Sequence, residues 1–412
     1  MSRFAPLVRN SLENPLIPIS SQEVVKYING GGHTNAGPFV NEQKSLTIAA
    51  VWRAVNLIAG TIAALPIHAY RADGDSRVMV TSGRAATLLA NPHPDMTQFE
   101  LMELITTHVL LWGNAYLFLS FNMKNQPTLI PLHPSRVWPK RTEAGDKVYT
   151  IDGMPGEFVD ADMRGTNDRA RVFHIPGFGY DGLRGLSAIQ AARQGLGLAL
   201  AAEEFGARLF ANGALSTGIV TTEGSLNEKQ MKALSAEWKQ KRSGLDKAFD
   251  TIFLDGGLKY QQLTIPPEDA QFLETRAFQI DEIARWFGVP PHMLMDVDKT
   301  TSWGSGIEQQ GIGFLVYTLR SWLTRFEQRF TKLITPEPVY ARFSVEGLLR
   351  GDSAARGAFY KQMWDMGVFS TNDIRRFEEL PPVDGGDVRY RPLNMGGLGT
   401  TDGTPATPPE GA

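Results

Sequence analysis

SAIQAARQGLGLALAAEEFGARLFAN, residues 187–212, is the stretch that decides how this chain is organised. Ser187 and Gln190 have the spacing of a capping box, and Gly213 provides a left-handed stop. Between them the pattern predicts one continuous helix, about 39 Å long at a rise of about 1.5 Å per residue. A helix of this length divides the chain into a part before it and a part after it.

A second long helix follows after a short interval. It is predicted to begin at Pro267 and to run to Phe287, with Gly288 closing it. The interval holds strand-like and helical patterns in alternation: Gly218 to Thr222, a charged helix Leu226 to Arg242, Thr251 to Leu254, and Leu258 to Leu263. The sequence therefore predicts two long helices that bracket a small mixed module.

The part before residue 187 mixes helices with short strands. Its longest apolar stretch is predicted to be a buried helix rather than a membrane span, because Arg53 and Asn56 lie near its middle. The apolar positions at three-and-four spacing are Ile48, Val51, Trp52, Val55, Ile58, Ala59, Ile62 and Leu65, and Pro66 ends the helix.

Turn and cap residues set the other elements of this part. Strands are expected at Ile67 to Arg71 and Arg77 to Val80, around an Asp73-Gly74 turn, and at Ala115 to Phe121. A capping box of Thr97 and Glu100 opens a helix Gln98 to Trp112. The prolines from 127 to 139 indicate edge strands and turns rather than a central strand. The part as a whole reads as an α+β unit, preceded by a proline- and glycine-containing arm, residues 1–44.

The part after Gly288 begins with a loop, Val289 to Gly306, and a third long helix, Ile307 to Ile334. The helix has an apolar stripe, and its basic residues lie off that stripe. These basic residues either face nucleic acid, or are solvated or paired with acids of neighbouring chains. The stripe is Leu315, Leu319, Trp322, Phe326, Phe330 and Leu333, and the basic residues are Arg320, Arg325, Arg329 and Lys332. Two short helices, Ser353 to Met366 and Asn372 to Leu380, precede a Gly-, Pro- and Thr-rich end expected to be disordered from Asp384.

The composition excludes several kinds of functional site. The chain of 412 residues has no cysteine, which excludes disulfides, thiolate nucleophiles and iron–sulfur clusters. Its 41 Lys+Arg against 44 Asp+Glu give a net charge of -3, so a dense basic DNA-binding surface is not expected. The seven histidines are scattered, without metal-ligand spacing, and neither a P-loop nor a G-x-S-x-G elbow is present. We expect no enzyme activity, no cofactor and no metal.

One glycine motif favours an enzyme. Gly177-Phe-Gly179-Tyr-Asp-Gly182 matches G-x-G-x-x-G, with Glu203 and Glu204 about 20 residues further on, as in a nucleotide-dependent oxidoreductase. Both glutamates fall inside one predicted helix, however, and not at the end of a second strand. A glycine-rich hinge before a long helix is the favoured interpretation, and the oxidoreductase is the alternative.

The order of these parts resembles the portal proteins of tailed bacteriophages, in the HK97-like branch that includes portals of gene-transfer agents. The resemblance covers about residues 45 to 390. It is carried by AVWRAVNLIA (50–59), LWGNAY (111–116), GLRGLSAI (182–189), AAEEFGARLFANG (201–213), LDGGLKY (254–260), PEDAQFLETR (267–276), GVPPH (288–292), IEQQ (307–310) and ELPPVDGGD (379–387).

The resemblance implies a closed ring, usually of twelve copies, at one capsid vertex, through which double-stranded DNA enters and leaves. It also implies partners: the terminase, the major capsid protein, and head-completion adaptor or tail proteins, with no membrane. The protein is then expected in the virion, and in the host cytoplasm during assembly. Another ring-shaped head-tail adaptor is a further alternative.

The portal plan maps onto the predicted parts. The boundaries are 1–44 for an N-terminal arm, 45–186 for the wing, 187–213 for a stem helix, 214–263 for the clip, 264–288 for the second stem helix, 289–306 for the tunnel loop, 307–344 for the long helix and return to the wing, 345–383 for a helical crown, and 384–412 for a disordered tail. On this plan Lys239 and Lys241 lie on the clip docking surface. The tunnel loop near DNA contains Lys299, Thr300, Thr301, Ser302 and Trp303.

Overall fold

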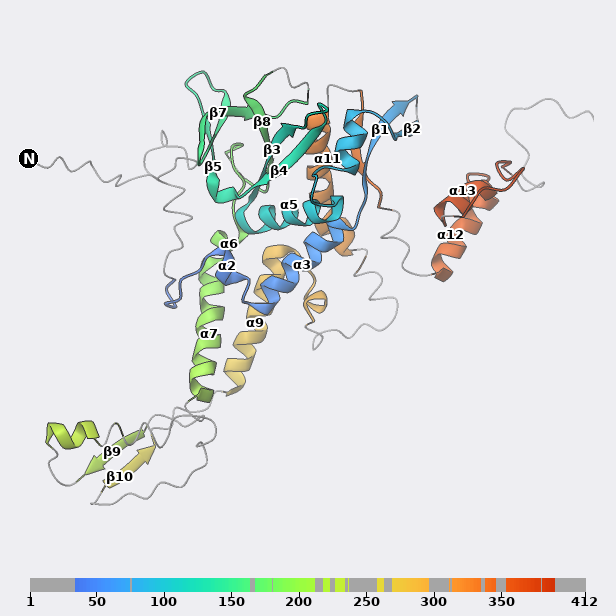
Figure 1. The fold of residues 1–412 in the computed structure, drawn as a ribbon. Coiled ribbons are helices and arrows are strands. Elements are labelled where there is room, and N and C mark those ends of the chain that lie inside the picture. The colour runs from blue at the N-terminus through green and yellow to red at the C-terminus, as the bar shows by residue number, and fades with distance from the viewer. Residues whose placement is uncertain are drawn as a thin grey trace, which may run out of the picture. The chain divides into compact units, whose positions relative to one another are not determined.

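The computed structural model has two compact units, residues 1–343 and 344–412 (Figure 1). The described residues are 34–74, 76–163, 167–179, 181–211, 218–222, 227–233, 236, 258–262, 269–295, 311, 313–334, 338–345, 353–378 and 380–389. Over these residues, no helix combines the length and the apolar character that crossing a membrane requires.

The body of the first unit is a six-stranded sheet in the order β4-β3-β8-β7-β6-β5. Neighbouring strands are antiparallel except for β7 and β8, which are parallel. The strands are β3 (Asn114–Phe121), β4 (Pro127–Leu132), β5 (Val137–Arg141), β6 (Lys147–Ile151), β7 (Met154–Asp160) and β8 (Ala170–Pro176). The mixed sheet with helices agrees with the predicted α+β class.

The proline-rich strands lie where a missing amide costs least. β4 and β5 are the two edges of the six-stranded sheet, as the sequence predicted for residues 127 to 139. Between them, the short 3₁₀ helix η1 (Pro134–Arg136) turns the chain.

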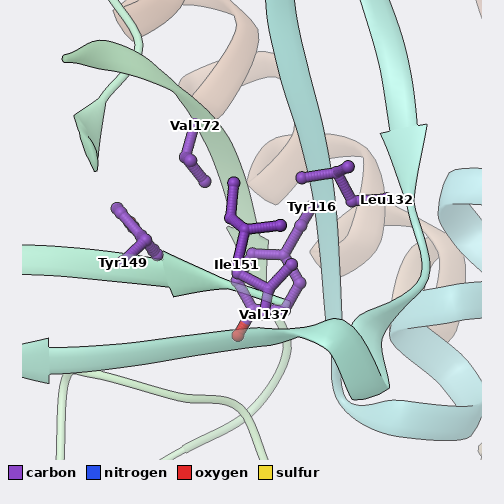
Figure 2. Packing of buried hydrophobic residues seen from close by; sticks show 6 residues of the cluster. All are labelled: Tyr116, Leu132, Val137, Tyr149, Ile151 and Val172. Carbon is purple, nitrogen blue, oxygen red and sulfur yellow. The ribbon is translucent and has the colours of Figure 1, made fainter. Parts of the chain in front are cut away.

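One side of the sheet buries a cluster of large side chains, drawn in Figure 2. Its members come from β3, β4, β5, β6 and β8, so the cluster joins strands from both halves of the sheet. They are Tyr116, Leu132, Val137, Tyr149, Ile151 and Val172. At roughly 2 kcal/mol for each fully buried side chain, this cluster is a main source of the sheet's stability.

Helices α3 (Ala49–Ala63) and α5 (Gln98–Trp112) pack against each other beside the sheet, with α4 (Arg84–Ala90) between them in sequence (Figure 1). The capping box of Thr97 and Glu100 is present, and α5 has the predicted bounds. In α3 the predicted apolar face is buried except at Trp52, which is 57% exposed. The prediction for Trp52 was wrong: the buried face of α3 instead includes Ala54.

A second sheet has three strands in the order β11-β1-β2. β1 (Ile67–Asp73) and β2 (Ser76–Val80) form the predicted hairpin around Gly74, which has a left-handed φ of 57°. β11 (Tyr340–Phe343) pairs with β1 although about 270 residues separate them, from the registers Tyr70 with Tyr340 and Ile67 with Phe343.

The predicted single helix 187–212 is two helices, α6 (Ala188–Ala191) and α7 (Arg193–Ala211). Ser187 caps α6 as expected, accepting a hydrogen bond from the amide of Gln190. Ala192, with ψ near 4°, leaves the helical region and separates the two. The prediction of an unbroken helix was therefore wrong at its first turn.

α7 contacts α9 (Asp269–Phe287), and the two lie side by side in Figure 1. Gly288 closes α9 with a left-handed φ of 66°, as predicted. Between them in sequence, β9 (Gly218–Thr222) and β10 (Leu258–Gln262) form an antiparallel pair, and residues 228–233 are helical. The rest of the predicted helix 226–242 and the predicted strand 251–254 lie outside the described residues.

After α9 come η3 (Pro291–Leu294), the π-helix η4 (Phe314–Leu319) and α11 (Arg320–Ile334). The apolar stripe of the predicted third helix is buried at Leu319, Phe326, Phe330 and Leu333. Leu323 is also buried, whereas Leu315 and Trp322 are half-buried. Phe330 packs on Phe173 of β8, with ring centroids 5.1 Å apart, which fixes α11 to the large sheet.

The second unit contains α12 (Ser353–Asp365) and α13 (Thr371–Phe377). Their bounds agree with those of the two predicted helices to within three residues. Ser370 and Asp373 form a capping box at α13. Residues 384–389 are bonded to the two helices and the turn between them. The amide of Asn372 donates to Gly386 O, and Arg389 Nε donates to Val368 O. Disorder was predicted from Asp384, which is too early by at least six residues.

Candidate functional site

Three glycines and Ser187 bring the end of α5, the end of β8 and the start of α6 into direct backbone contact. We call this group of residues, Leu111 to Asn114 with Gly177, Gly185 and Ser187, the junction. Gly113 has a left-handed φ of 73°, and its carbonyl accepts from the amide of Gly177 at 2.7 Å. A Cβ on Gly185 would lie 2.0 Å from Gly113 O. Only glycine permits this approach.

Asn114 holds the junction together from inside. Its side chain is 1% exposed and meets both backbone groups of Gly185: Nδ2 donates to Gly185 O and Oδ1 accepts from Gly185 N, each at 2.8 Å. Nδ2 also donates to Trp112 O at 3.1 Å. A buried amide so fully bonded gives a fixed position to the chain that leads into α6 and α7.

Asn114 is also part of a polar cluster on the sheet. The other members of this polar cluster are Lys147, Tyr149, Asp160 and His174. His174 is fully buried, with Nε2 3.0 Å from Asn114 Oδ1 and Nδ1 2.9 Å from Lys147 Nζ. Since the first partner is an acceptor and the second a donor, His174 is neutral with its proton on Nε2. Burial, reinforced by the charge of Lys147, holds the pKa of His174 well below its usual value.

The same cluster contains a balanced pair of charges. Tyr149 OH donates to Asp160 Oδ1, and Lys332 Nζ lies 2.8 Å from Asp160 Oδ2. Burial alone would raise the pKa of Asp160, but the hydrogen bonds from Lys332 and Tyr149 outweigh it and lower the pKa. Burial lowers the pKa of Lys147 to about 8. The cluster ties β3, β6, β7 and β8 to α11.

Two basic residues of α11 bind groups of the same chain. Arg325 Nη1 donates to Pro176 O at 2.9 Å and to Gly177 O at 2.8 Å, and Lys332 pairs with Asp160. Arg325 and Lys332 thus bond groups of their own chain, which neither interpretation of this helix predicted. Arg320 remains exposed.

The glycine motif 177–182 belongs to the junction rather than to a phosphate site. Asp181 Oδ1 accepts from the amides of Leu183 and Arg184, at 2.8 and 3.0 Å, so these donors face a carboxylate of the chain itself. Glu203 and Glu204 lie within α7. A dinucleotide fold needs its acid at the end of a second parallel strand. This geometry opposes the oxidoreductase alternative. Within the described ranges, His, Asp and Glu side chains form no group of three that could hold a metal.

The helix pair α7–α9 is the second candidate site. Gly195 of α7 lies against Glu282 of α9, and Gly197 against Thr34, where an added Cβ would come within 2.4 Å of the threonine side chain. On the outer faces, large apolar side chains remain exposed: Leu198 by 47%, Phe278 by 56% and Trp286 by 45%. Such a surface is typical of a subunit that is completed by assembly with other chains.

The site residues named from the sequence cannot be placed. Lys239 and Lys241 lie outside the described residues, as do Lys299, Thr300, Thr301, Ser302 and Trp303. Sequence reasoning missed the junction and the polar cluster. The motifs LWGNAY and GLRGLS contain Asn114 and Gly185, but no local pattern shows that residues 71 positions apart bond to each other.

The fold thus defines an assembly subunit with a sheet body and an exposed helix pair. A family model described as "Phage portal protein" matches residues 49–379, and this protein belongs to that family. It is 37% identical over 361 residues to the portal protein of Enterobacteria phage HK97, covering 85% of this chain and 83% of that protein. It is 33% identical over 385 residues to the probable portal protein of Streptomyces phage phiC31, covering 90% and 83%.

Solved structures agree with this assignment at the level of the fold. A chain from the neck of a native gene transfer agent particle, computed with C12 symmetry, has a TM-score of 0.53 and 24% identity, and the match covers 87% of this chain and 99% of that one. The predicted resemblance to HK97-like portal proteins is confirmed, and the family supports a structural role and a place in the virion.

Proposed function

We propose that twelve copies of this protein form a closed ring at one capsid vertex and that double-stranded DNA passes through its centre. Family membership and the twelvefold symmetry of the gene transfer agent neck support this proposal. So does the net charge of -3, because a channel for sliding DNA requires loose contacts.

The observation that carries the ring is the exposed apolar surface of the α7–α9 pair. A ring of identical copies needs a head-to-tail contact, in which one face of a subunit meets a different face of the next. Leu198 lies on α7, and Phe278 and Trp286 lie on α9, so both helices offer apolar surface. Burial of each such side chain against a neighbour contributes roughly 1 to 2 kcal/mol.

The parts of the subunit then take the roles of the portal plan. Residues 45–186 form the wing, 187–213 and 264–288 the stem, 214–263 the clip and 345–383 the crown. The ring nucleates capsid assembly with the major capsid protein in the host cytoplasm, docks the terminase during packaging, and later holds head-completion adaptor and tail proteins. Lys239 and Lys241 present positive charge on the clip to these docking partners.

Residues 289–306 form the tunnel loop of this proposal. Lys299 would give a ring of weak positive potential, and Thr300, Thr301 and Ser302 offer hydroxyls that bond phosphate without fixed charge. Trp303 would either contact the duplex or pack back on its own helix, and packing is the favoured interpretation. The loop therefore acts on DNA by weak, repeated contacts.

Electron microscopy of the purified protein, with native mass spectrometry, tests the ring. We expect closed rings with a central hole and a mass of a high oligomer. A monomer or dimer that persists across salt and protein concentrations contradicts the ring. Replacing residues 299–303 with a shorter Gly-Ser linker should keep rings and reduce packaged DNA, whereas Lys239→Glu with Lys241→Glu should keep rings and weaken terminase docking.

A further inference from the structure

The hairpin of β1 and β2 extends beyond the core of its sheet. Ile67 and Ala69 are buried, but every described residue from Arg71 to Met79 is exposed. Val78 and Met79, on opposite faces of β2, are 44% and 47% exposed. Each face of the hairpin therefore offers one large apolar side chain to a partner.

The hairpin also has an open backbone edge. β2 is the last strand of the sheet β11-β1-β2. In the antiparallel register, Ser76, Val78 and Val80 exchange hydrogen bonds with β1, so the amides and carbonyls of Arg77 and Met79 point away from the sheet. In the part of the chain that the structure describes, no hydrogen bond reaches these four groups.

The other three edges of the two larger sheets are closed by the chain itself. On β11, the amides of Ala341 and Phe343 donate to Thr331 Oγ1 and Glu327 Oε1. On β4, the outward amide of Leu129 donates to Pro92 O, and its neighbours Pro127 and Pro131 have none.

The β5 edge is closed in a similar way at its first two outward positions. Its Val137 amide donates to Pro134 O, and Pro139 has no amide to offer. Proteins protect exposed sheet edges in such ways, since an unprotected edge pairs with any extended chain. The edge of β2 is therefore the exception.

Side chains beside the open edge define what fits there. Tyr340, Tyr70 and Met79 stand in one row across the three strands, and the rings of the two tyrosines are 6.1 Å apart. Arg77 lies on the same face, over the ring of Tyr70 at 5.1 Å, and makes no ion pair with any residue in the described ranges. A strand added to β2 would place one side chain beside Met79 and, two residues along, another beside Arg77.

We propose that the edge of β2 binds an extended acidic segment of another protein of the phage particle, which adds as a further strand. The segment carries an apolar residue opposite Met79 and a carboxylate opposite Arg77. The backbone groups of Arg77 and Met79 supply the affinity, and the two side chains supply the specificity. The inference rests on the proposed role of the chain in a phage particle.

The described strands of a second copy of the chain are poorer occupants. Pairing of β2 with β2 would be a two-fold contact, which closes a dimer and does not continue around a ring. Pairing of β2 with β4, β5 or β11 of a neighbour meets edges that are already closed. An extended segment from a different protein meets neither obstacle.

The photocrosslinking residue p-benzoylphenylalanine in place of Met79 tests the proposal in particles assembled in the producing cell. Mass spectrometry then identifies the attached peptide. We expect adducts concentrated on one segment of another protein, with Asp or Glu two residues from the attachment point. Adding Arg77→Glu should lower the adduct yield about fivefold, because attraction becomes repulsion.

Ile130 is the matched control position for the crosslinker, because its side chain is 42% exposed on β4, whose edge is closed. Crosslinker there should give little adduct, and Arg141→Glu, at an exposed arginine of the other sheet, should leave the yield of the Met79 crosslinker unchanged. Adducts on another copy of this chain, or a yield at 79 no higher than at 130, overturn the proposal. Native mass spectrometry of the same proteins separates this outcome from failure of the ring itself.

Discussion

The large sheet and the helix pair α7–α9 differ in how far contacts within one chain cover their side chains. The sheet bonds the buried polar groups of Asn114 and His174 within one chain and closes on itself through the junction glycines. The helix pair leaves Leu198, Phe278 and Trp286 exposed. The difference shows that a subunit can have a self-sufficient body and a part that depends on its neighbours. Changes in the body should then affect folding, and changes on the helix pair should affect assembly.

Gly185→Ala tests the sheet side of this comparison most severely. The new Cβ would lie 2.0 Å from Gly113 O and 2.5 Å from Gly177 N, both rigid backbone atoms. We expect a loss of about 4 kcal/mol in the free energy of unfolding, measured by urea denaturation. Gly60→Ala in α3 is the control, because no atom closer than 4.0 Å opposes its Cβ. It should stabilise the protein by about 1 kcal/mol.

Asn114→Ala removes the buried amide that bonds Gly185, Trp112 and His174. Because several buried partners lose their hydrogen bonds together, we expect a destabilisation of about 3 kcal/mol in the same assay. The exposed Asn56→Ala is the control and should change stability by less than about 0.5 kcal/mol. Equal effects at the two positions would show that the junction does not hold the body together.

Acid should weaken the body through His108 of α5. Burial, with a contribution from the nearby His133, lowers the pKa of His108 to about 4. The unfolded chain binds a proton near pH 6.5, whereas the folded chain does so only near pH 4, so stability falls as the pH drops between these values. The loss should reach about 3 kcal/mol. In His108→Gln, the free energy of unfolding, measured by urea denaturation, should depend less on pH across this range. An unchanged pH dependence contradicts the assignment.

Trp286→Ser together with Phe278→Ser tests the helix-pair side. Both residues are exposed in one chain, so we expect little change in the unfolding of the subunit. Assembly should weaken about thirtyfold in concentration, equivalent to about 2 kcal/mol, measured by analytical ultracentrifugation. Met123→Ser, on an exposed turn of the sheet body, is the control and should assemble normally. Parallel losses in folding and assembly would remove the distinction between the two regions.

Local chemistry made much of the fold predictable. The capping box Thr97–Glu100 predicted α5 with its bounds, the Asp73-Gly74 turn predicted the hairpin of β1 and β2, and Gly288 predicted the end of α9. Each of these signals acts within about four residues. The edge positions of β4 and β5 followed from proline's missing amide.

Contacts between distant residues were not predictable in the same way. Ala192 favours helix by itself, yet the helix breaks there, and Ser187, five residues earlier, donates to Leu111 O. The pairing of Asn114 with Gly185 and of Lys332 with Asp160 depends on how strands and helices that are distant in sequence pack together. The exposed Trp52 shares its apolar character with its buried neighbours, so helical spacing cannot separate them.

The π-helix η4 gives the protein a tolerance in chain length. A π-turn holds one residue more than an α-turn, so η4 has room to lose one residue and become α-helical. The helix on both sides of η4 would then keep its phase, and Phe326 and Phe330 would keep their places on the sheet. Deletion of the exposed Val316 should change unfolding by less than about 1 kcal/mol, and deletion of Leu323 in regular helix by far more. At η4, therefore, the chain can be one residue shorter without a change in the body of the subunit.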